Sequence, residues 1–144
     1  MRDISHLNKY RFVIETQEQK LLQKISDNQK KQVQEQRKYD MLKSCLLETR
    51  SQLLAKAEIA IPASAFAQYQ HFINQLDKAL RQQSDALAGC KMIHDKYMES
   101  YKELKLKRMK LNELVDKITR DNNQSANRKE NQNNTEIFNR LNRS

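Results

Sequence analysis

The chain has 144 residues, of which 38% are hydrophobic, 31% are charged and 6% are aromatic, with no tryptophan. A single glycine and a single proline exclude folds rich in loops or β-turns, which need these residues at their turns. The low apolar content suits a narrow seam between long helices and predicts an all-α, elongated protein. The net charge of +9 favours an acidic partner, whether nucleic acid, anionic lipid or an acidic protein surface.

The first predicted helix covers residues 3–59 and follows a heptad pattern. Steps of three and four residues define a seam with apolar ends and a polar middle. Its members are Ile4, Leu7, Arg11, Ile14, Glu18, Leu21, Ile25, Asn28, Gln32, Glu35, Tyr39, Leu42, Leu46, Thr49 and Leu53. A sustained spacing of 3.5 residues keeps one side of a helix against a partner helix, which is the coiled-coil condition.

The stretch IPAS predicts a turn over residues 60–63. Pro62 cannot continue a helix, and it disfavours helical backbone angles at Ile61. We expect the second helix to begin at Ser64, with the serine hydroxyl capping its first free N–H groups. Because short connections join antiparallel neighbours, the two helices should form a hairpin.

The second predicted helix starts at residue 64 and carries the more apolar seam. Its members are Phe66, Tyr69, Ile73, Leu76, Leu80, Gln83, Leu87, Cys90, His94, Tyr97, Tyr101, Leu104, Arg108, Leu111, Val115 and Ile118. In the hairpin, facing residues should have numbers that add up to about 123. This register predicts two ion pairs between the helices: Arg108 with Glu15 or Glu18, and Arg11 with Glu113 or Asp116.

The predicted hairpin occupies residues 1–121, and an asparagine-rich extension follows at 122–144. Asparagine is a poor helix former, so the extension is expected to be a frayed helix or disordered. Ile137, Phe138 and Leu141 share one helical face, which favours ordering against a partner as the alternative.

Catalytic, cofactor and metal sites are not predicted. The three histidines are spread along the chain, Cys45 and Cys90 lack metal-ligand spacing, and the lone Gly89 makes no phosphate loop. Two packed helices also lack the concave pocket in which active sites usually lie. We therefore predict that the protein is not an enzyme and binds no cofactor.

The sequence also gives no indication of a membrane span or a secretion signal. No run approaches the ~18 consecutive apolar residues of a membrane span. The stretch MRDISHLNKYRF has no apolar signal-peptide core. We expect a cytoplasmic protein without direct membrane insertion.

A basic cluster lies in KELKLKRMKLNELVDK, residues 102–117. Its members are Lys102, Lys105, Lys107, Arg108, Lys110 and Lys117. The cluster is either a solvated flank of the coiled coil or a surface that docks on an acidic protein. Nucleic acid is disfavoured as a partner, because stacking aromatics are not interleaved with these charges.

Apolar residues outside the seams gather near the predicted turn. Phe72, Ala79 and Ala86 flank the second seam, and Leu47 and Leu54 lie beside the first. A two-stranded coil does not need them. They indicate a partner site, or alternatively a wider seam or dimer packing.

The chain resembles the FliJ family of bacterial flagellar export proteins over its whole length, in its hairpin pattern, basic charge and position of the turn. The most specific matches are YQHFINQLDKAL after the turn and RKENQNNTEIFNRL near the end. The chain is more distantly similar to the YscO-type stalk proteins of virulence type III secretion. The resemblance implies a central stalk in the hexameric export ATPase. It also implies contacts with the cytoplasmic domain of the export gate and with export chaperones, at the inner membrane.

The resemblance also implies binding residues. For the export gate they are Phe72, Leu76, Ala79 and Gln83, with Leu42 and Tyr39 on the first helix, and for the ATPase they are Lys102, Lys105, Lys107, Arg108 and Lys110. Gln83 replaces a histidine that is usual in the family. Cys45 and Thr49 stand where the family has tyrosines, and Tyr39 is the nearest substitute.

Other interpretations remain open at this point. A generic coiled-coil scaffold or dimerisation module would show the same heptads, and a parallel dimer could replace the hairpin. A YscO-like virulence stalk and a basic rod that binds nucleic acid are further alternatives.

Overall fold

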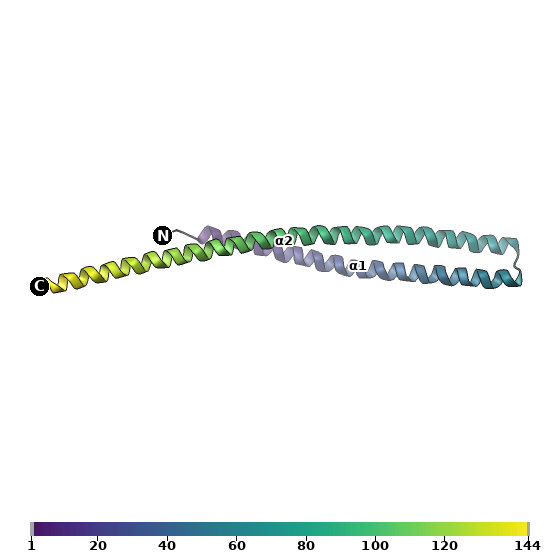
Figure 1. Ribbon diagram of the computed structural model, residues 1–144. Coiled ribbons are helices and arrows are strands. Elements are labelled where there is room, and N and C mark those ends of the chain that lie inside the picture. Colours follow the sequence, from purple (N-terminus) through teal and green to yellow (C-terminus); the bar gives the residue numbers. More distant parts are fainter. Residues whose placement is uncertain (1, 144) are drawn as a thin grey trace. The chain divides into compact units, whose positions relative to one another are not determined.

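The computed structural model describes residues 2–143. It contains two α-helices, α1 (Ser5–Ile59) and α2 (Ala63–Asn142), which pack against each other as a helical hairpin (Figure 1). The prediction of an all-α hairpin is therefore confirmed. No helix among the described residues is long and apolar enough to cross a membrane.

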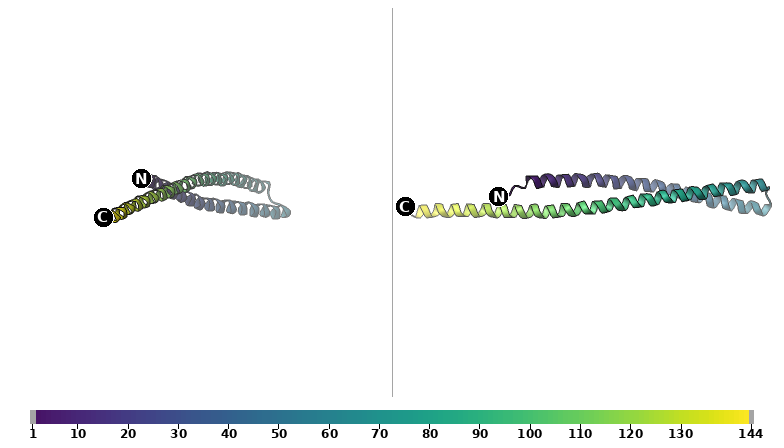
Figure 2. Two further views of the ribbon diagram at one scale, coloured as in Figure 1. Left: turned by 60° about the vertical axis from the view of Figure 1, so that its left-hand side comes forward. Right: turned by 90° about the horizontal axis from the view of Figure 1, so that it is seen from above.

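Contacts divide the hairpin into two compact units. The turn unit comprises Leu22–Glu99, and the terminal unit comprises the residues up to Leu21 together with those from Ser100 onward. In the terminal unit, α2 extends well beyond the start of α1, as Figure 1 and the right-hand view of Figure 2 show. Each unit has its own buried residues.

The heptad seams correctly identify the side chains between the helices. Every predicted seam position of α1 is buried or half-buried, and the same holds for α2 except at Phe66. In the turn unit, Leu46, Leu53, Ile73 and Leu76 form a core against which Leu42, Cys45, Ile61, Tyr69 and Leu80 pack. In the terminal unit the buried apolar residues are Ile14, Leu111, Val115 and Ile118. Phe66, in the first turn of α2, is 43% exposed.

Hydrogen bonds across the seam confirm the antiparallel register. Arg108 Nε lies 2.8 Å from Glu18 Oε1, which is one of the two predicted ion pairs. The prediction for Arg11 is wrong: its guanidinium donates to the amide oxygens of Asn112, at 3.3 Å, and Asn8, at 3.0 Å. Asn112 lies across the seam from Arg11, so the guanidinium bonds to the Asn112 amide oxygen and not to the carboxylate of Glu113 or Asp116.

A side chain caps the start of α1, whereas α2 starts on backbone hydrogen bonds alone among those described. Asp3 accepts bonds from the backbone N–H and the hydroxyl of Ser5, at 2.9 and 3.0 Å, and these bonds lower the pKa of Asp3. At the second start, the carbonyl of Pro62 accepts from the N–H groups of Ala65 and Phe66. Ser64 is the second residue of α2, so the prediction that it caps the helix from outside is wrong. α2 begins one residue earlier, at Ala63, because proline fits immediately before the first helical turn.

The connection Ala60–Pro62 contains one residue with left-handed backbone angles. Ala60 has φ 68° directly after the last residue of α1. Helices often end this way, but usually with glycine, because a Cβ makes this conformation unfavourable by roughly 1 kcal/mol.

Replacing Ala60 by glycine is expected to raise the free energy of unfolding by about 0.5–1 kcal/mol. Thermal unfolding followed by circular dichroism measures the change. Ala57→Gly, three residues earlier and inside α1, is the matched control and should lower stability by about 1 kcal/mol. Equal destabilisation by both glycines would contradict the role assigned to the Ala60 backbone.

The asparagine-rich extension is helical. α2 continues without interruption to Asn142, and the side chains of residues 127–142 are exposed. Ile137 and Phe138 are 55% and 62% exposed. The sequence left fraying, disorder and helix open, and the structure shows a helix.

Candidate partner-binding surfaces

The six residues expected to bind an export gate lie in very different environments. Phe72 is 44% exposed and Ala79 is half-buried, so both are accessible on the flank of α2. Leu76 is only 7% exposed, because it belongs to the core of the turn unit. A partner that binds Phe72 therefore reaches Leu76 only at its edge.

The side chain of Gln83 lies in the seam and bonds to α1. Its side-chain amide donates to the main-chain oxygen of Glu35, at 2.9 Å, and to the Glu35 carboxylate. Tyr39 and Leu42 on α1 are half-buried, and Leu42 packs against the core. The hairpin thus leaves Phe72 and Ala79 as the accessible part of the predicted gate surface.

The bond from Gln83 makes stability depend on the charge of Glu35. It lowers the pKa of the Glu35 carboxyl from 4.5, with smaller contributions from Lys38 and Lys31. A lowered folded-state pKa means that the stabilisation is present above pH 4.5 and is lost as the pH falls through the folded-state value.

We expect Glu35→Gln to flatten the loss of stability on acidification. The measurement is the melting temperature at several values between neutral pH and roughly pH 3. Glu58→Gln, an exposed glutamate in the same unit, is the control and should leave the slope of the wild type unchanged. Identical slopes for Glu35→Gln and wild type would contradict the assignment.

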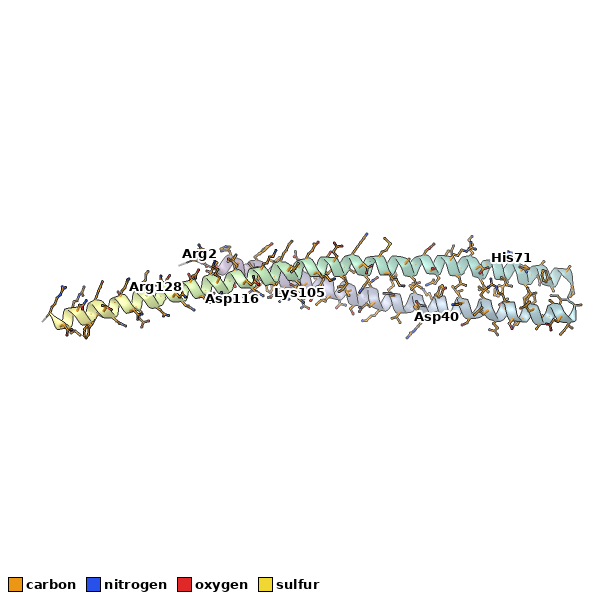
Figure 3. All side chains as sticks on the ribbon, viewed as in Figure 1. Arg2, Asp40, His71, Lys105, Asp116 and Arg128 are labelled. Atoms are coloured by element: carbon orange, nitrogen blue, oxygen red, sulfur yellow. The ribbon has the colours of Figure 1, made fainter. Side chains whose placement is uncertain are left out.

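The predicted ATPase-binding residues separate into two groups. Lys102, Lys105, Lys107 and Lys110 are exposed on α2 in the terminal unit, and Figure 3 labels Lys105 on this stretch. Arg108 differs, because its side chain points into the seam and pairs with Glu18. Four lysines therefore form the accessible basic surface.

Exposed apolar residues next to these lysines were not predicted. In the terminal unit, Phe12 is 69% exposed, and other large apolar side chains are also exposed on both helices: Tyr10, Val13, Leu106, Met109 and Leu114. They occupy heptad positions outside the seam, so an inspection of apolar residues off the seam in residues 1–21 and 100–121 would have found them.

Groups that could support chemistry are scarce in the described part of the chain. No cluster of three or more metal-binding side chains occurs there. Cys45 and Cys90 are free thiols. His94, predicted as a polar seam position, has a buried Nδ1 without a hydrogen-bond partner.

A comparison with protein-family models matches residues 6–143 to the family described as "Flagellar FliJ protein". The chain belongs to the FliJ family. The match spans nearly all of the hairpin, including the extension. No curated protein and no solved structure matches the chain.

FliJ membership confirms the resemblance inferred from the two sequence segments. FliJ proteins are non-catalytic components of the flagellar export apparatus, and this chain is assigned to that apparatus. The helical hairpin agrees with such a structural role.

Proposed function

We propose that the protein is the central stalk of the hexameric flagellar export ATPase, and that it also contacts the export gate and export chaperones. The observation that carries this proposal is the FliJ match over residues 6–143. In this role the protein is cytoplasmic and peripheral at the inner-membrane export apparatus. It couples its partners mechanically and catalyses no reaction.

The terminal unit is the part proposed to dock in the ATPase. Lys102, Lys105, Lys107 and Lys110 supply positive charge for an acidic surface, and the exposed Leu106 and Met109 between them in the sequence supply apolar area. Basic side chains at a rim mainly set the rate and specificity of docking, while apolar side chains set much of the affinity.

The flank of α2 in the turn unit is proposed to bind the export gate. Phe72 and Ala79 are spaced seven residues apart and so lie on one side of the helix. The buried Leu76 and the half-buried Gln83, Leu42 and Tyr39 lie in the seam, where they are proposed to contribute to gate binding through the packing of α1 on α2.

Stimulation of the cognate export ATPase tests the stalk assignment. The triple variant Lys105→Gln, Lys107→Gln and Lys110→Gln should bind the ATPase about ten-fold more weakly and lose stimulation at the same protein concentration. The matched control is Lys24→Gln, Lys31→Gln and Lys38→Gln, which removes the same charge from exposed positions in the turn unit. If both triple variants lost ATPase binding and stimulation equally, the effect would come from net charge alone, and the proposed surface would be contradicted.

Binding to the isolated cytoplasmic domain of the gate protein tests the second surface. Phe72→Ala should weaken binding while leaving the hairpin folded, because Phe72 lies outside the core. Leu54→Ala, at an exposed leucine on α1 in the same unit, is the control. Unchanged gate binding by Phe72→Ala would rule out this flank.

A further inference from the structure

A second surface of the turn unit lies on the opposite side of the seam from Phe72. A hollow of about 420 Å³ opens there between Arg50, Leu53 and Leu54 on α1 and Ile73, Asn74 and Asp77 on α2. An adjoining hollow of about 440 Å³ shares Asn74 and Asp77 and extends along α2 to Lys78 and Arg81. Together they form a shallow groove, named here the Leu54 groove.

Helix geometry separates the Leu54 groove from the Phe72 flank. Gln70 lines the groove together with Leu54. Phe72 follows Gln70 by two residues, a rotation of roughly 200° around α2. A ligand in the groove therefore does not contact the flank proposed for the export gate.

The groove has an apolar wall that the hairpin does not use. Leu54 is 70% exposed, and Leu47, two helical turns earlier on the same side of α1, is 55% exposed. The buried Leu53 and Ile73 form the floor. Two exposed leucines seven residues apart match the spacing with which an amphipathic helix presents its own apolar side chains.

The charged residues around the groove are mostly basic. Arg50, Lys78 and Arg81 line it, and Asp77 is the one acidic lining residue. Arg50 Nη2 lies 3.5 Å from Asp77 Oδ2, and their side chains are 49% and 37% exposed. Such an exposed pair contributes little to stability, so both side chains are available to a partner. The remaining positive charge selects for an acidic ligand.

We propose that the Leu54 groove binds an acidic amphipathic helix of another protein. Its apolar side packs on Leu47 and Leu54, and its carboxylates pair with Arg50 and Arg81. This surface is distinct from both surfaces in the proposed stalk function and does not depend on that function.

The test uses the full chain and a synthetic fluorescein-labelled peptide of three heptads, with leucine at the seam positions and glutamate at the flanking ones. A peptide with lysine in place of glutamate is the charge-reversed probe. Fluorescence anisotropy should show binding of the acidic peptide and at least about ten-fold weaker binding of the basic one. Equal binding of the two peptides, or no binding of the acidic one, would overturn the proposal.

Two sets of variants locate the binding. Leu47→Ser with Leu54→Ser, and separately Arg50→Glu with Arg81→Glu, should each weaken binding of the acidic peptide by about ten-fold or more. Phe72→Ser, on the other side of α2, should leave it within about two-fold. Circular dichroism checks that each variant keeps its helices. A loss in Phe72→Ser equal to that in the leucine variant would overturn the assignment.

The same variants distinguish other occupants of the groove. Sedimentation measures self-association of the chain, and co-sedimentation with phosphatidylglycerol vesicles measures lipid binding. Self-association or vesicle binding that depends on Leu47 and Leu54, without binding of the acidic peptide, would replace the proposed partner by a second copy or by a membrane.

Discussion

Replacing Leu76 by alanine is expected to lower the free energy of unfolding by about 2–5 kcal/mol. Leu76 is 7% exposed and forms the core of the turn unit with Leu46, Leu53 and Ile73. The shorter side chain loses its burial and leaves a cavity that two helices can close only in part. Urea unfolding followed by circular dichroism gives the change.

Leu54→Ala is the matched control, because it removes the same atoms from a side chain that is 70% exposed. It should change stability by no more than about 0.5 kcal/mol. Similar changes in the free energy of unfolding for the two variants would show that burial of Leu76 does not stabilise the turn unit. The comparison also decides how gate-binding data are interpreted, since weaker binding by Leu76→Ala would follow from loss of structure alone.

Replacing Arg108 by alanine is expected to lower the free energy of unfolding by about 2–4 kcal/mol. The Glu18 side chain is 8% exposed, and its carboxylate accepts a 2.8 Å bond from Arg108 Nε. Removing the arginine leaves this carboxylate in the seam without its cationic partner. The opposite change, Glu18→Ala, should cost less, because the Arg108 side chain is 29% exposed and its guanidinium can turn toward water.

A double-mutant cycle measures the coupling between these two residues. In the cycle of Glu18→Leu, Arg108→Leu and their combination, the double variant should recover most of the stability that Arg108→Leu loses, because the seam then holds two apolar residues in place of an ion pair. Lys107→Ala, next to Arg108 on the exposed side of α2, is the control and should change stability by no more than about 0.5 kcal/mol. Additive effects in the cycle would contradict a direct interaction.

The two predictions bear on the proposed surfaces as well as on stability. Arg108 is part of the basic cluster expected to bind the ATPase, yet its charge is used inside the hairpin. Leu76 is part of the surface expected to bind the gate, yet its side chain is used in the core. Among the predicted binding residues, Phe72 and the exposed lysines are therefore the informative positions for partner mutagenesis.

The sequence by itself determined the two helices and the side of each helix that is buried, and it predicted their antiparallel pairing, which the structure confirms over a parallel dimer. These features follow from local rules: the 3.5-residue spacing of apolar residues places a seam on one side of a helix, and Pro62 prevents one helix from continuing through residues 60–62. The resemblance to the FliJ family also came from the sequence, and the match over residues 6–143 confirms it. The gate and ATPase residues stay predictions.

Only the tertiary structure decided which polar groups meet across the seam. Spacing alone allowed Arg108 either Glu15 or Glu18 and offered Arg11 two carboxylates, but the axial offset of the helices brings Glu18 to Arg108 and Asn112 to Arg11. An offset of one residue, about 1.5 Å, changes which atoms come within hydrogen-bonding distance. The same packing buries Leu76 in the core and bonds Gln83 to α1. It also places Leu54 and Phe72 on opposite sides of the seam. Heptad spacing defines the buried side of each helix, whereas the contact between two helices defines what remains available to a partner.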